Sequence, residues 1–509
     1  MAVEIELKLR ITPEQLAKLK RNTLLRAHSV SRPTTHRLYN IYYDTPKLEL
    51  HSSKMALRLR HDEGSWLQTL KAGGSVHAGL HQRNEWEVAV SGPTLDFSSP
   101  EQAEWKMNLP LSLRNKLQPV FVTDFFRTSR MLDFKGSQIE LCIDQGMISI
   151  EHRSMPVCEL ELELKSGEPQ HLFELALEIL DVVPFELETF SKAEQGYRLL
   201  SGYTEDPASG VARVLAKTDM LADGLKAQIW SGLQHFQVNF SGVMGHGAMV
   251  CDDAEYLHQM RVALRRLRVV LRLAEKVRAD KQLAGFYKDV SELCFALGRI
   301  REWDVFIDQM VQPMCMRRPE HAGLQALLRV SELQRTACYS ALRGDAHVRE
   351  VQRLLLRFAI WMNGKYWKPS GRQPQVQDFA TRRLSKLTKR FVRFGQRLDT
   401  ADAGQLHALR ILAKKLRYSA EFFASWYGKQ KAGVYLVSLS KVQDVLGWIN
   451  DVAAAHRLLD ELETGAALAG HQDAAALARS WIAHEHAGEL PVLRKCMKKF
   501  NGQPLFWKK

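Results

Sequence analysis

The segment Val3-Glu4-Ile5-Glu6-Leu7-Lys8-Leu9-Arg10 alternates apolar and charged residues along its whole length. In an extended strand this alternation puts the apolar side chains on one face and the charged side chains on the other. A second segment far along the chain, Cys158-Glu159-Leu160-Glu161-Leu162-Glu163-Leu164-Lys165, has the same pattern. The charged face of such a strand commonly meets water. Two strands with acidic faces predict instead that a cation lies between them.

The size and composition of the chain predict a globular protein of two or three domains, since it has 509 residues and 45% of them are hydrophobic. No apolar leader precedes the first strand and no run of 18 apolar residues occurs, so we expect a protein that is neither exported nor membrane-spanning. The seven cysteines form no CxxC pair, which argues against a disulfide framework or a zinc site. A reducing cytoplasm fits these features best.

The charge is divided unevenly between the two parts of the chain. Residues 1–204 carry 24 Lys and Arg against 27 Asp and Glu, whereas residues 205–509 carry 47 against 30, a net charge of +17. The second part therefore predicts a polyanionic partner. A generally basic, solvated helical surface is the alternative.

The first 200 residues predict antiparallel strands with one charged face each. The expected segments are 3–10, 36–46, 56–60, 65–71, 82–88, 120–127, 138–144 and 158–165, with turns at Gly73-Gly74 and Asp144-Gln145-Gly146 and a helix at 171–180. Such strands can close into a barrel with a charged interior.

The charged side chains of this barrel would line its interior. The basic ones are Arg58, Arg60, Lys71, Arg83 and Lys192, and the acidic ones are Glu4, Glu6, Asp144, Glu159 and Glu161. Carboxylates suit Mg²⁺ or Mn²⁺ and arginines suit phosphate oxygens, so the set predicts a metal-bound phosphate chain. Mutual pairing of the acids and bases across the sheet is the alternative.

An ordered set of motifs in residues 1–200 resembles the CYTH superfamily, the triphosphate tunnel metalloenzymes. The motifs are Glu4-x-Glu6-x-Lys8, Tyr43-Asp44-Thr45, Leu57-Arg58-Leu59-Arg60, Lys71, Arg83-x-Glu85, Arg127, Asp144, Glu159-x-Glu161 and Ser191-Lys192. The resemblance implies an eight-stranded antiparallel barrel that forms a tunnel, and hydrolysis or transfer on triphosphate substrates with Mg²⁺ or Mn²⁺.

The resemblance also implies a role for each matching residue. Metal ligands would be Glu4, Glu6, Asp144, Glu159 and Glu161, and phosphate-positioning or tunnel-wall residues would be Lys8, Arg58, Arg60, Lys71, Arg83, Glu85, Arg127 and Lys192. Glu163 shares the strand face of Glu159 and Glu161, so the pair that binds metal stays open among these three. Arg130 lies on the opposite face from Arg127 and is left out, and no general base is identified.

A polar linker over residues 201–217 separates the strands from a helical region with a repeated pattern. In residues 257–271, His258, Arg261, Arg265 and Arg268 form a basic stripe beside an apolar one. The stripe returns 149 residues later as His407, Arg410, Lys414 and Arg417, which predicts an internal duplication whose basic stripes face each other across a channel.

The helical region, residues 218–500, resembles the CHAD domain through the pattern H-x-x-R-x-x-x-[RK]-[RK]-x-R in both halves. The resemblance implies a helical bundle that binds inorganic polyphosphate. The residues implied are His258, Arg261, Arg265, Arg268, His407, Arg410, Lys414 and Arg417, and a further basic helix carries Arg382, Arg383, Lys386, Lys389, Arg390 and Arg393.

The sequence thus predicts an α+β protein with a CYTH domain at 1–200, a linker at 201–217 and a CHAD domain at 218–500. The predicted function is metal-dependent hydrolysis of inorganic tripolyphosphate to pyrophosphate and phosphate, with polyphosphate bound by the helical domain and no membrane partner. The alternatives are a thiamine triphosphatase, an adenylate cyclase, or a non-catalytic protein that binds polyphosphate or, non-specifically, nucleic acid.

Overall fold

The structure is a computed structural model of the 509-residue chain. The residues that it describes are 2–98, 109–202, 206–210, 220–245, 254–277, 280–364, 374–398, 402–427, 429–465, 468, 470–485 and 488–508. Most of the linker predicted at 201–217 lies outside the described residues.

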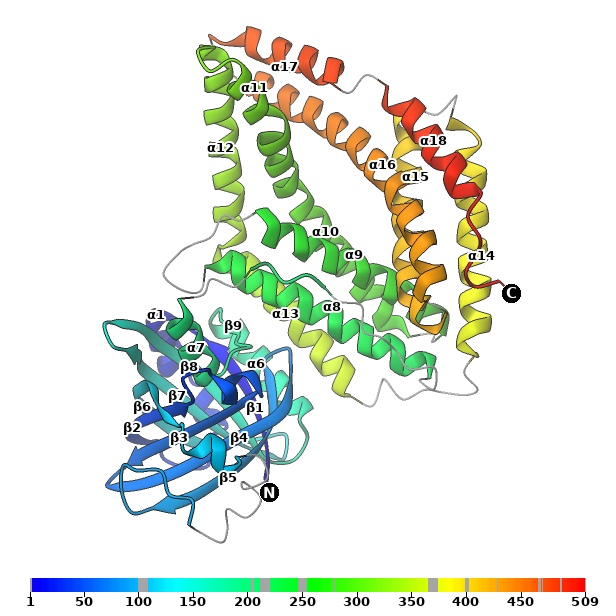
Figure 1. The fold of residues 1–509 in the computed structure, drawn as a ribbon. Coiled ribbons are helices and arrows are strands. Elements are labelled where there is room, and N and C mark those ends of the chain that lie inside the picture. Colours follow the sequence, from blue (N-terminus) through cyan, green and yellow to red (C-terminus); the bar gives the residue numbers. More distant parts are fainter. Residues whose placement is uncertain are drawn as a thin grey trace. The chain divides into compact units, whose positions relative to one another are not determined.

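The N-terminal part is a closed antiparallel barrel of eight strands (Figure 1). The strands are β1 (Ala2–Arg10), β2 (Thr34–Asp44), β3 (Met55–Asp62), β4 (Ser65–His77), β5 (Leu80–Val90), β6 (Gln118–Phe134), β7 (Ser137–Ile150) and β8 (Arg153–Ser166). They hydrogen-bond in the order β5-β4-β3-β2-β6-β7-β8-β1, and pairing of β1 with β5 closes the sheet. The predicted eight-stranded antiparallel barrel is confirmed.

Alternation along the strands puts apolar side chains on the outer face of the barrel and charged side chains on the inner face. Leu7, Leu9, Leu160 and Leu162 have no exposed surface. Helix α6 (Gln170–Val182) packs against β1 and β8, the strands that carry these leucines. The charged residues between them are the ones that meet inside the barrel.

Two turns predicted from glycine-containing segments were wrong. Asp144-Gln145-Gly146 lies within β7, where a Cβ on Gly146 would come 2.4 Å from the Cα of Phe125, so the glycine is needed for close strand packing. Gly73 and Gly74 lie within β4 at an irregularity of its pairing with β5, and both have a positive φ. Pairing with neighbouring strands overrides the local turn preference in both cases.

The remaining elements of the barrel region are short. They are α1 (Pro13–Arg21), α2 (Leu24–Ala27), α3 (Glu49–Ser52), α5 (Leu111–Arg114), the two-residue strand β9 (Glu186–Leu187) and α7 (Lys192–Ser201). Ser191 begins α7 with a capping box to Glu194. The hydroxyl of Tyr197 in α7 donates to Asp44, a buried carboxylate that also accepts from three backbone amides at 45, 50 and 51. Asp44 therefore fixes α7 and the start of α3 to the end of β2.

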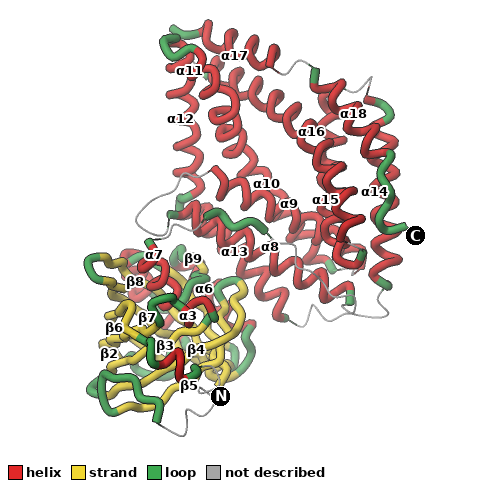
Figure 2. Tube along the Cα trace, in the orientation of Figure 1, coloured by secondary structure: helices red, strands yellow, loops and turns green. Residues whose placement is uncertain are grey.

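The described residues after Asp206 lie mainly in helices (Figure 2). The helices are α8 (Leu221–Met244), α9 (Ala254–Val277), α10 (Lys281–Phe306), α11 (Gln312–Arg317), α12 (Ala322–Leu342), α13 (Asp345–Asn363), α14 (Val376–Gly395), α15 (Ala403–Phe423), α16 (Lys429–Thr464), α17 (Gln472–Glu485) and α18 (Glu489–Asn501), with a π-helical turn at Ile307–Val311 and a 3-10 turn at Ala424–Trp426. One apolar core lies where α10, α12, α16 and α17 meet, around Trp303, Phe306, Leu458 and Ile482. In the described part of the chain, no helix is long and apolar enough to cross a membrane.

Contacts divide the described chain into two compact units. The first holds the residues up to Asp206 together with α13, and the second holds the other helices after Asp206. Helix α13 lies within the range predicted for the helical domain, yet it packs against α6 and β9 of the barrel region. The domain boundaries predicted from the sequence, and the internal duplication, stay predictions.

Candidate functional site

Three buried carboxylates meet inside the barrel. Asp144 comes from β7 and Glu159 and Glu161 come from β8, and one ligand oxygen of each lies within 4.8 Å of the others. The two strands pair with Asp144 opposite Glu159, so strand register alone brings these groups together. Glu163, on the same strand face, is partly exposed and pairs with Lys165 at 2.6 Å. The geometry thus separates Glu163 from the cluster.

Three cations surround this acidic cluster. The Lys192 ammonium contacts all three carboxylates, at 2.6 Å from Asp144 and 3.0 Å from Glu161. Arg127 donates two parallel hydrogen bonds to Asp144, at 2.8 and 2.6 Å, and also contacts Glu161. Lys8 contacts Glu161 as well and lies 2.8 Å from Glu6.

A second charged group lies around Lys71. Its ammonium is 2.5 Å from Glu4 and 3.3 Å from Glu85, and Glu85 in turn lies 3.6 Å from Arg58. Lys71 is on β4 and Glu4 on β1, so their contact reaches across β5 on the inner face. The Nε of Arg58 is buried and has no hydrogen-bond partner within the described chain. This donor is free to bind an added anion.

The two other predicted arginines also lie in the barrel. Arg83 pairs with Glu194 of α7 at 3.0 Å, and Arg60 donates to Asn40 at 3.0 Å. The structure therefore brings the thirteen barrel residues predicted from the sequence into one charged interior, mostly in mutual ion pairs. The mutual pairing that the sequence left as an alternative is present in this structure.

Burial and charge shift several pKa values in this interior. Burial, followed by the neighbouring Glu161, raises the pKa of Glu159 to about 7 despite Lys192. Burial opposes ionisation of Glu6 too, but the charge of Lys8 lowers its pKa to about 2. Burial lowers the pKa of Arg60 to about 10, with help from Arg58 and Arg127. The nearby positive charges of Arg58 and Arg127 favour an anion beside Arg60.

The acidic cluster fits a divalent cation chemically. Its donors are carboxylate oxygens, which are the ligands that Mg²⁺ and Mn²⁺ prefer. A cation bound by Asp144, Glu159 and Glu161 would compete with the Lys192 ammonium, which neutralises the same oxygens in this structure.

Sequence reasoning missed His81 and Glu194. His81 lies opposite Glu6 in the pairing of β1 with β5, is 1% exposed, and has a buried Nδ1 without a partner in the described chain. Its position two residues before Arg83 on the same strand face was the signal available in the sequence. Glu194 comes from the capping box of α7, and no strand pattern points to it.

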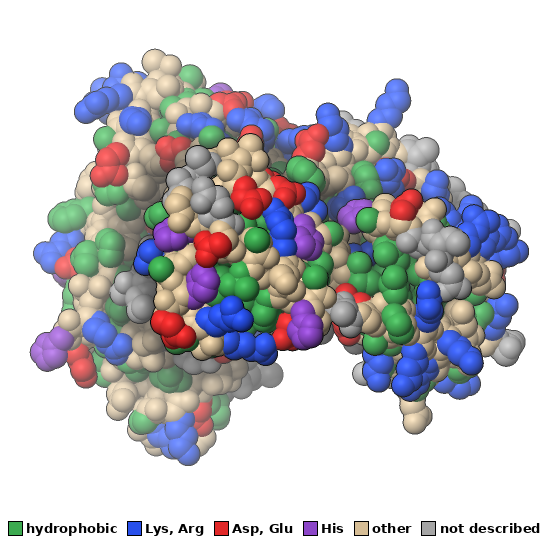
Figure 3. Space-filling view, turned by 90° about the horizontal axis from the view of Figure 1, so that it is seen from above, with side chains coloured by type: hydrophobic (Ala, Val, Ile, Leu, Met, Phe, Trp, Pro, Cys, Tyr) green, Lys and Arg blue, Asp and Glu red, His purple; other side chains and the backbone are tan. Residues whose placement is uncertain are grey.

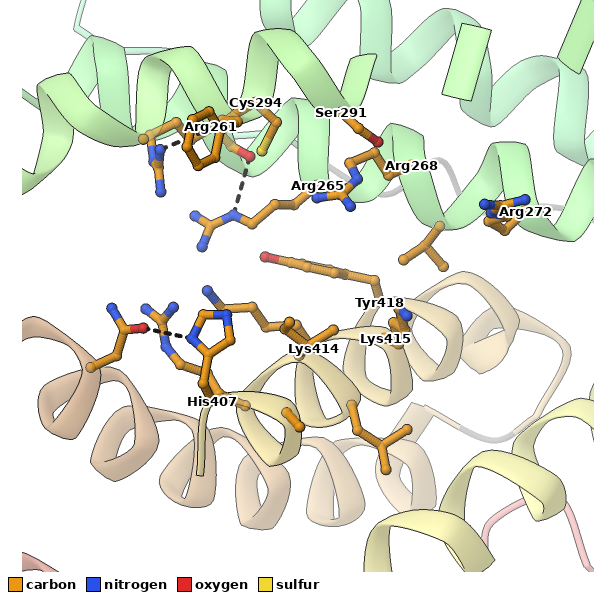
Figure 4. A pocket seen from close by; sticks show the side chains of 18 of the residues that line it. Arg261, Arg265, Arg268, Arg272, Ser291, Cys294, His407, Lys414, Lys415 and Tyr418 are labelled. Carbon is orange, nitrogen blue, oxygen red and sulfur yellow. Dashed lines mark hydrogen bonds between the residues drawn. The ribbon is translucent and has the colours of Figure 1, made fainter. Parts of the chain in front are cut away.

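A basic pocket of about 1180 Å³ lies in the helical unit. Seven of the eight predicted polyphosphate-binding residues line it, and they are His258, Arg261, Arg265 and Arg268 of α9 with His407, Arg410 and Lys414 of α15. Figure 4 shows Arg265 of α9 and Lys414 of α15 extending into the space between their helices, with Tyr418 beside them. The two stripes thus face one pocket.

Cations dominate the wall of the pocket. Thirteen Lys and Arg side chains line it, against three Asp and Glu, among the residues that the structure describes. The Nε atoms of Arg268, Arg383 and Arg410 are buried there without a hydrogen-bond partner in the described chain. Because buried donors are normally satisfied, these atoms favour an anionic ligand.

The eighth predicted residue, Arg417, does not line the pocket. It donates to Glu421 at 2.8 Å and to Gln443 at 3.1 Å. Arg266, the adjacent basic residue of the repeated pattern, donates instead to the backbone of Gly210 at 2.6 Å. It therefore holds part of the linker rather than facing the pocket.

The crowding of cations lowers pKa values in the pocket. Burial, followed by the charges of Arg265 and Arg410, lowers the pKa of Lys414 to about 6. Burial and Arg265 lower the pKa of Arg261 to about 10. Burial lowers the pKa of His258 to about 4, and Arg265 adds to this effect. A bound anion would oppose each of these shifts.

The predicted basic helix corresponds to α14 and divides between the pocket and the surface. Arg383 and Arg390 line the pocket, whereas Arg382, Lys386, Lys389 and Arg393 are exposed. Lys495, Lys498 and Lys499 of the packed helix α18 are also exposed. Figure 3 shows Lys and Arg side chains gathered on the right of the visible face.

Two family descriptions match the chain. Residues 2–197 match the CYTH domain and residues 227–460 match the CHAD domain. The inorganic triphosphatase of Haemophilus influenzae is 36% identical over 205 residues, which are 39% of this chain and 55% of that protein. An uncharacterized protein of Mycobacterium tuberculosis is 27% identical over 203 residues, or 39% of this chain and 40% of that protein. This chain therefore spans about half the length of these relatives.

Among solved structures, the CHAD domain from the plant Ricinus communis is 27% identical to this chain, with a TM-score of 0.49. The match covers 58% of this chain and 97% of that domain.

Proposed function

Because this chain contains a CYTH domain followed by a CHAD domain, we propose that it is a metal-dependent inorganic triphosphatase whose helical unit binds polyphosphate. The observation that carries the proposal is the buried cluster of Asp144, Glu159 and Glu161, surrounded by cations inside a closed barrel. The 36% identity to a protein named inorganic triphosphatase supports the same activity.

In the proposed reaction, the barrel residues bind and orient the triphosphate. Arg58 has a buried Nε without a partner in the described chain, and Arg60 lies near the charges of Arg58 and Arg127, so both would bind phosphate oxygens. Lys8 and Arg127 would stabilise charge that develops on the phosphoryl and pyrophosphate groups, because they are held close to the reacting region by carboxylates. Asp144, Glu159 and Glu161 would hold the divalent cation, which when bound supplies Lewis-acid polarisation of phosphate oxygens.

The full chain is expected to release phosphate from tripolyphosphate with Mg²⁺ or Mn²⁺ much faster than from ATP or thiamine triphosphate. An inorganic chain needs only charge complementarity, which the barrel interior has in abundance. The measurement is initial rate against substrate concentration for the three substrates, with and without chelator. Preference for an organic triphosphate would support the hypothesis of a thiamine triphosphatase or an adenylate cyclase. No release from any substrate, with polyphosphate still bound, would make the protein a binding protein.

The helical pocket would bind inorganic polyphosphate through the stripes of α9 and α15. A lining with thirteen Lys and Arg side chains matches a linear polyanion, and the three buried Nε donors lack acceptors in the described chain. Linear polyphosphate, with one charge on each phosphate, fits this lining better than a ligand that needs base-specific contacts.

Polyphosphate binding to this pocket is expected to weaken as pH rises from 6 to 8. Lys414 has a pKa of about 6 in the free protein, and a bound polyanion raises this pKa. At a pH between the pKa of the free protein and that of the complex, binding is therefore accompanied by uptake of a proton. The affinity should fall by up to about tenfold per pH unit in that range. The charged neighbours of Lys414 are Arg261, Arg265, Arg410 and Asp451.

The matched control for this pH dependence is Lys414→Arg, which keeps the positive charge at all these pH values. The dissociation constant for polyphosphate, measured at constant ionic strength, should vary less with pH in this variant than in the wild type. An equal slope in both proteins would contradict the assignment to Lys414. His258, with its pKa of about 4, should contribute only toward the acidic end.

A further inference from the structure

Helix α13 belongs by contact to the barrel, although its residues fall within the match to the CHAD domain. It packs along α6 and touches β9. Arg349 donates to the backbone carbonyl of Leu180 in α6, and Arg353 pairs with Asp181 at 2.7 Å. Six residues of α6 are buried, and this helix contacts β1 and β8 as well as α13.

The side chain of Gln352 makes the most specific of these contacts. Its Oε1 accepts a hydrogen bond from the backbone N–H of Leu187 in β9 at 3.1 Å. Both residues are 1% exposed. Leu187 pairs with Leu9 of β1 in the sheet, and its own N–H is bound by Gln352. A buried N–H that lost this partner would be costly, so Gln352 stabilises the position of β9.

The segment beside Leu187 in turn holds the place where the barrel closes. The N–H of Glu188 donates to the carbonyl of Lys8 at 2.8 Å, and the carbonyl of Glu188 lies 3.2 Å from Nε2 of His81. Lys8 is on β1 and His81 on β5, the two strands whose pairing closes the sheet. Residues 186–188 thus bridge both sides of this seam.

The packing at the seam leaves little room for movement. A Cβ on Gly79, which precedes β5, would lie 3.2 Å from Cβ of Leu187 and 3.3 Å from the carbonyl oxygen of Lys8. Arg10 of β1 also pairs with Glu186 and Glu188, at 3.3 and 3.4 Å. A shift of β9 would therefore move β1, which carries Glu4, Glu6 and Lys8.

From these contacts we infer that α13 is a structural part of the catalytic barrel and that Gln352 is a positioning residue for its closing seam. It acts on the reaction through β9 and β1, without touching the substrate. A helix encoded in the middle of the C-terminal region thus completes the N-terminal domain. The kinetic consequence rests on the proposed triphosphatase function, whereas the structural consequence does not.

The test compares full-length Gln352→Leu with wild type by hydrogen–deuterium exchange and by tripolyphosphate hydrolysis. Leucine has a similar volume but no acceptor, so the amides of Leu187, Glu188 and Lys8 should exchange about threefold to tenfold faster, the factor expected from one net hydrogen bond. The turnover number should fall by a comparable factor while polyphosphate binding by the helical pocket stays unchanged. Glu350→Gln, an exposed change on the same helix, is the matched control.

A second variant, Gln352→Asn, keeps the amide but is one methylene too short to reach Leu187. It should reproduce the local increase in exchange even if Gln352→Leu folds poorly. Unchanged exchange at 187 and 188 in both variants would overturn the inference, and so would a uniform increase through β6 and β7, because that would indicate general destabilisation. If the wild-type protein hydrolyses no triphosphate, the function fails, and the exchange measurement still decides the role of Gln352.

Discussion

Replacing Glu161 by Gln is expected to lower tripolyphosphate hydrolysis by about 100-fold or more, whereas Glu163→Gln should leave it within about twofold. Both residues lie on β8 with the same strand parity, and the two substitutions are isosteric. Glu161 contacts Lys8, Arg127 and Lys192 and belongs to the buried acidic cluster. Glu163 is partly exposed and pairs with Lys165. The measurement is the initial rate of phosphate release at saturating metal.

Replacing Glu161 also removes a negative charge that neutralises three cations, which can destabilise the fold. Each variant is therefore checked for folding by thermal unfolding and for polyphosphate binding. If Glu161→Gln is unstable, Glu159→Gln tests the same cluster with a smaller expected loss of stability. Glu159 has a pKa of about 7, so its carboxyl is already close to half protonated at neutral pH. Equal activities of folded Glu161→Gln and Glu163→Gln would mean that the cluster holds no catalytic metal.

The two segments with acidic faces, residues 3–10 and 158–165, predicted the architecture. Alternation of apolar and charged residues is enough to define a strand and its two faces. The structure pairs them directly, with Lys8 of β1 opposite Glu161 of β8. The alternation also separated the buried leucines outside the barrel from the charges inside it. The barrel and its thirteen interior residues therefore followed from local pattern combined with the family resemblance.

Contacts that depend on strand register and on distant segments could not be read from the alternation. Lys192 reaches the acidic cluster from the first turn of α7, and Asp144 lies in the middle of β7 although its neighbours favour a turn. The choice among Glu159, Glu161 and Glu163 was open because all three share one parity. The pairing of β7 with β8, which sets Asp144 opposite Glu159, and the ion pair of Glu163 with Lys165 distinguish them.

The repeated pattern of the basic stripes in the helical unit does not determine which of two equivalent residues lines the pocket. Arg268 and Arg417 are equivalent at the offset of 149 residues, yet only Arg268 lines the pocket. Arg417 bonds to Glu421 one helical turn later, and the residue equivalent to Glu421 in the first stripe is Arg272, which cannot pair with Arg268. Glu421, four residues after Arg417, was therefore the sequence signal that Arg417 would form an ion pair within its own helix and not line the pocket.

This difference leads to the second large effect, in which Arg268→Gln weakens polyphosphate binding by about 10- to 100-fold and Arg417→Gln changes it by less than about threefold. The Nε of Arg268 is buried and unpaired in the described chain, so a phosphate oxygen would supply its missing acceptor. Arg417 already donates to Glu421 and Gln443. Both changes remove one positive charge, so a long-range effect of net charge alone would weaken binding equally.

Isothermal titration with polyphosphate of defined length measures this difference, at constant ionic strength and with chelator present. A Glu161→Gln background prevents hydrolysis during the titration. At low salt the general attraction between a chain of net charge +14 and a polyanion would obscure a local contact, so the comparison is made near physiological ionic strength. Equal losses in Arg268→Gln and Arg417→Gln would show that binding follows net charge and that the pocket is not the binding site. A loss confined to Arg268→Gln would tie polyphosphate to the space between α9 and α15, since Arg268 lines that space whereas Arg417 does not and pairs with Glu421.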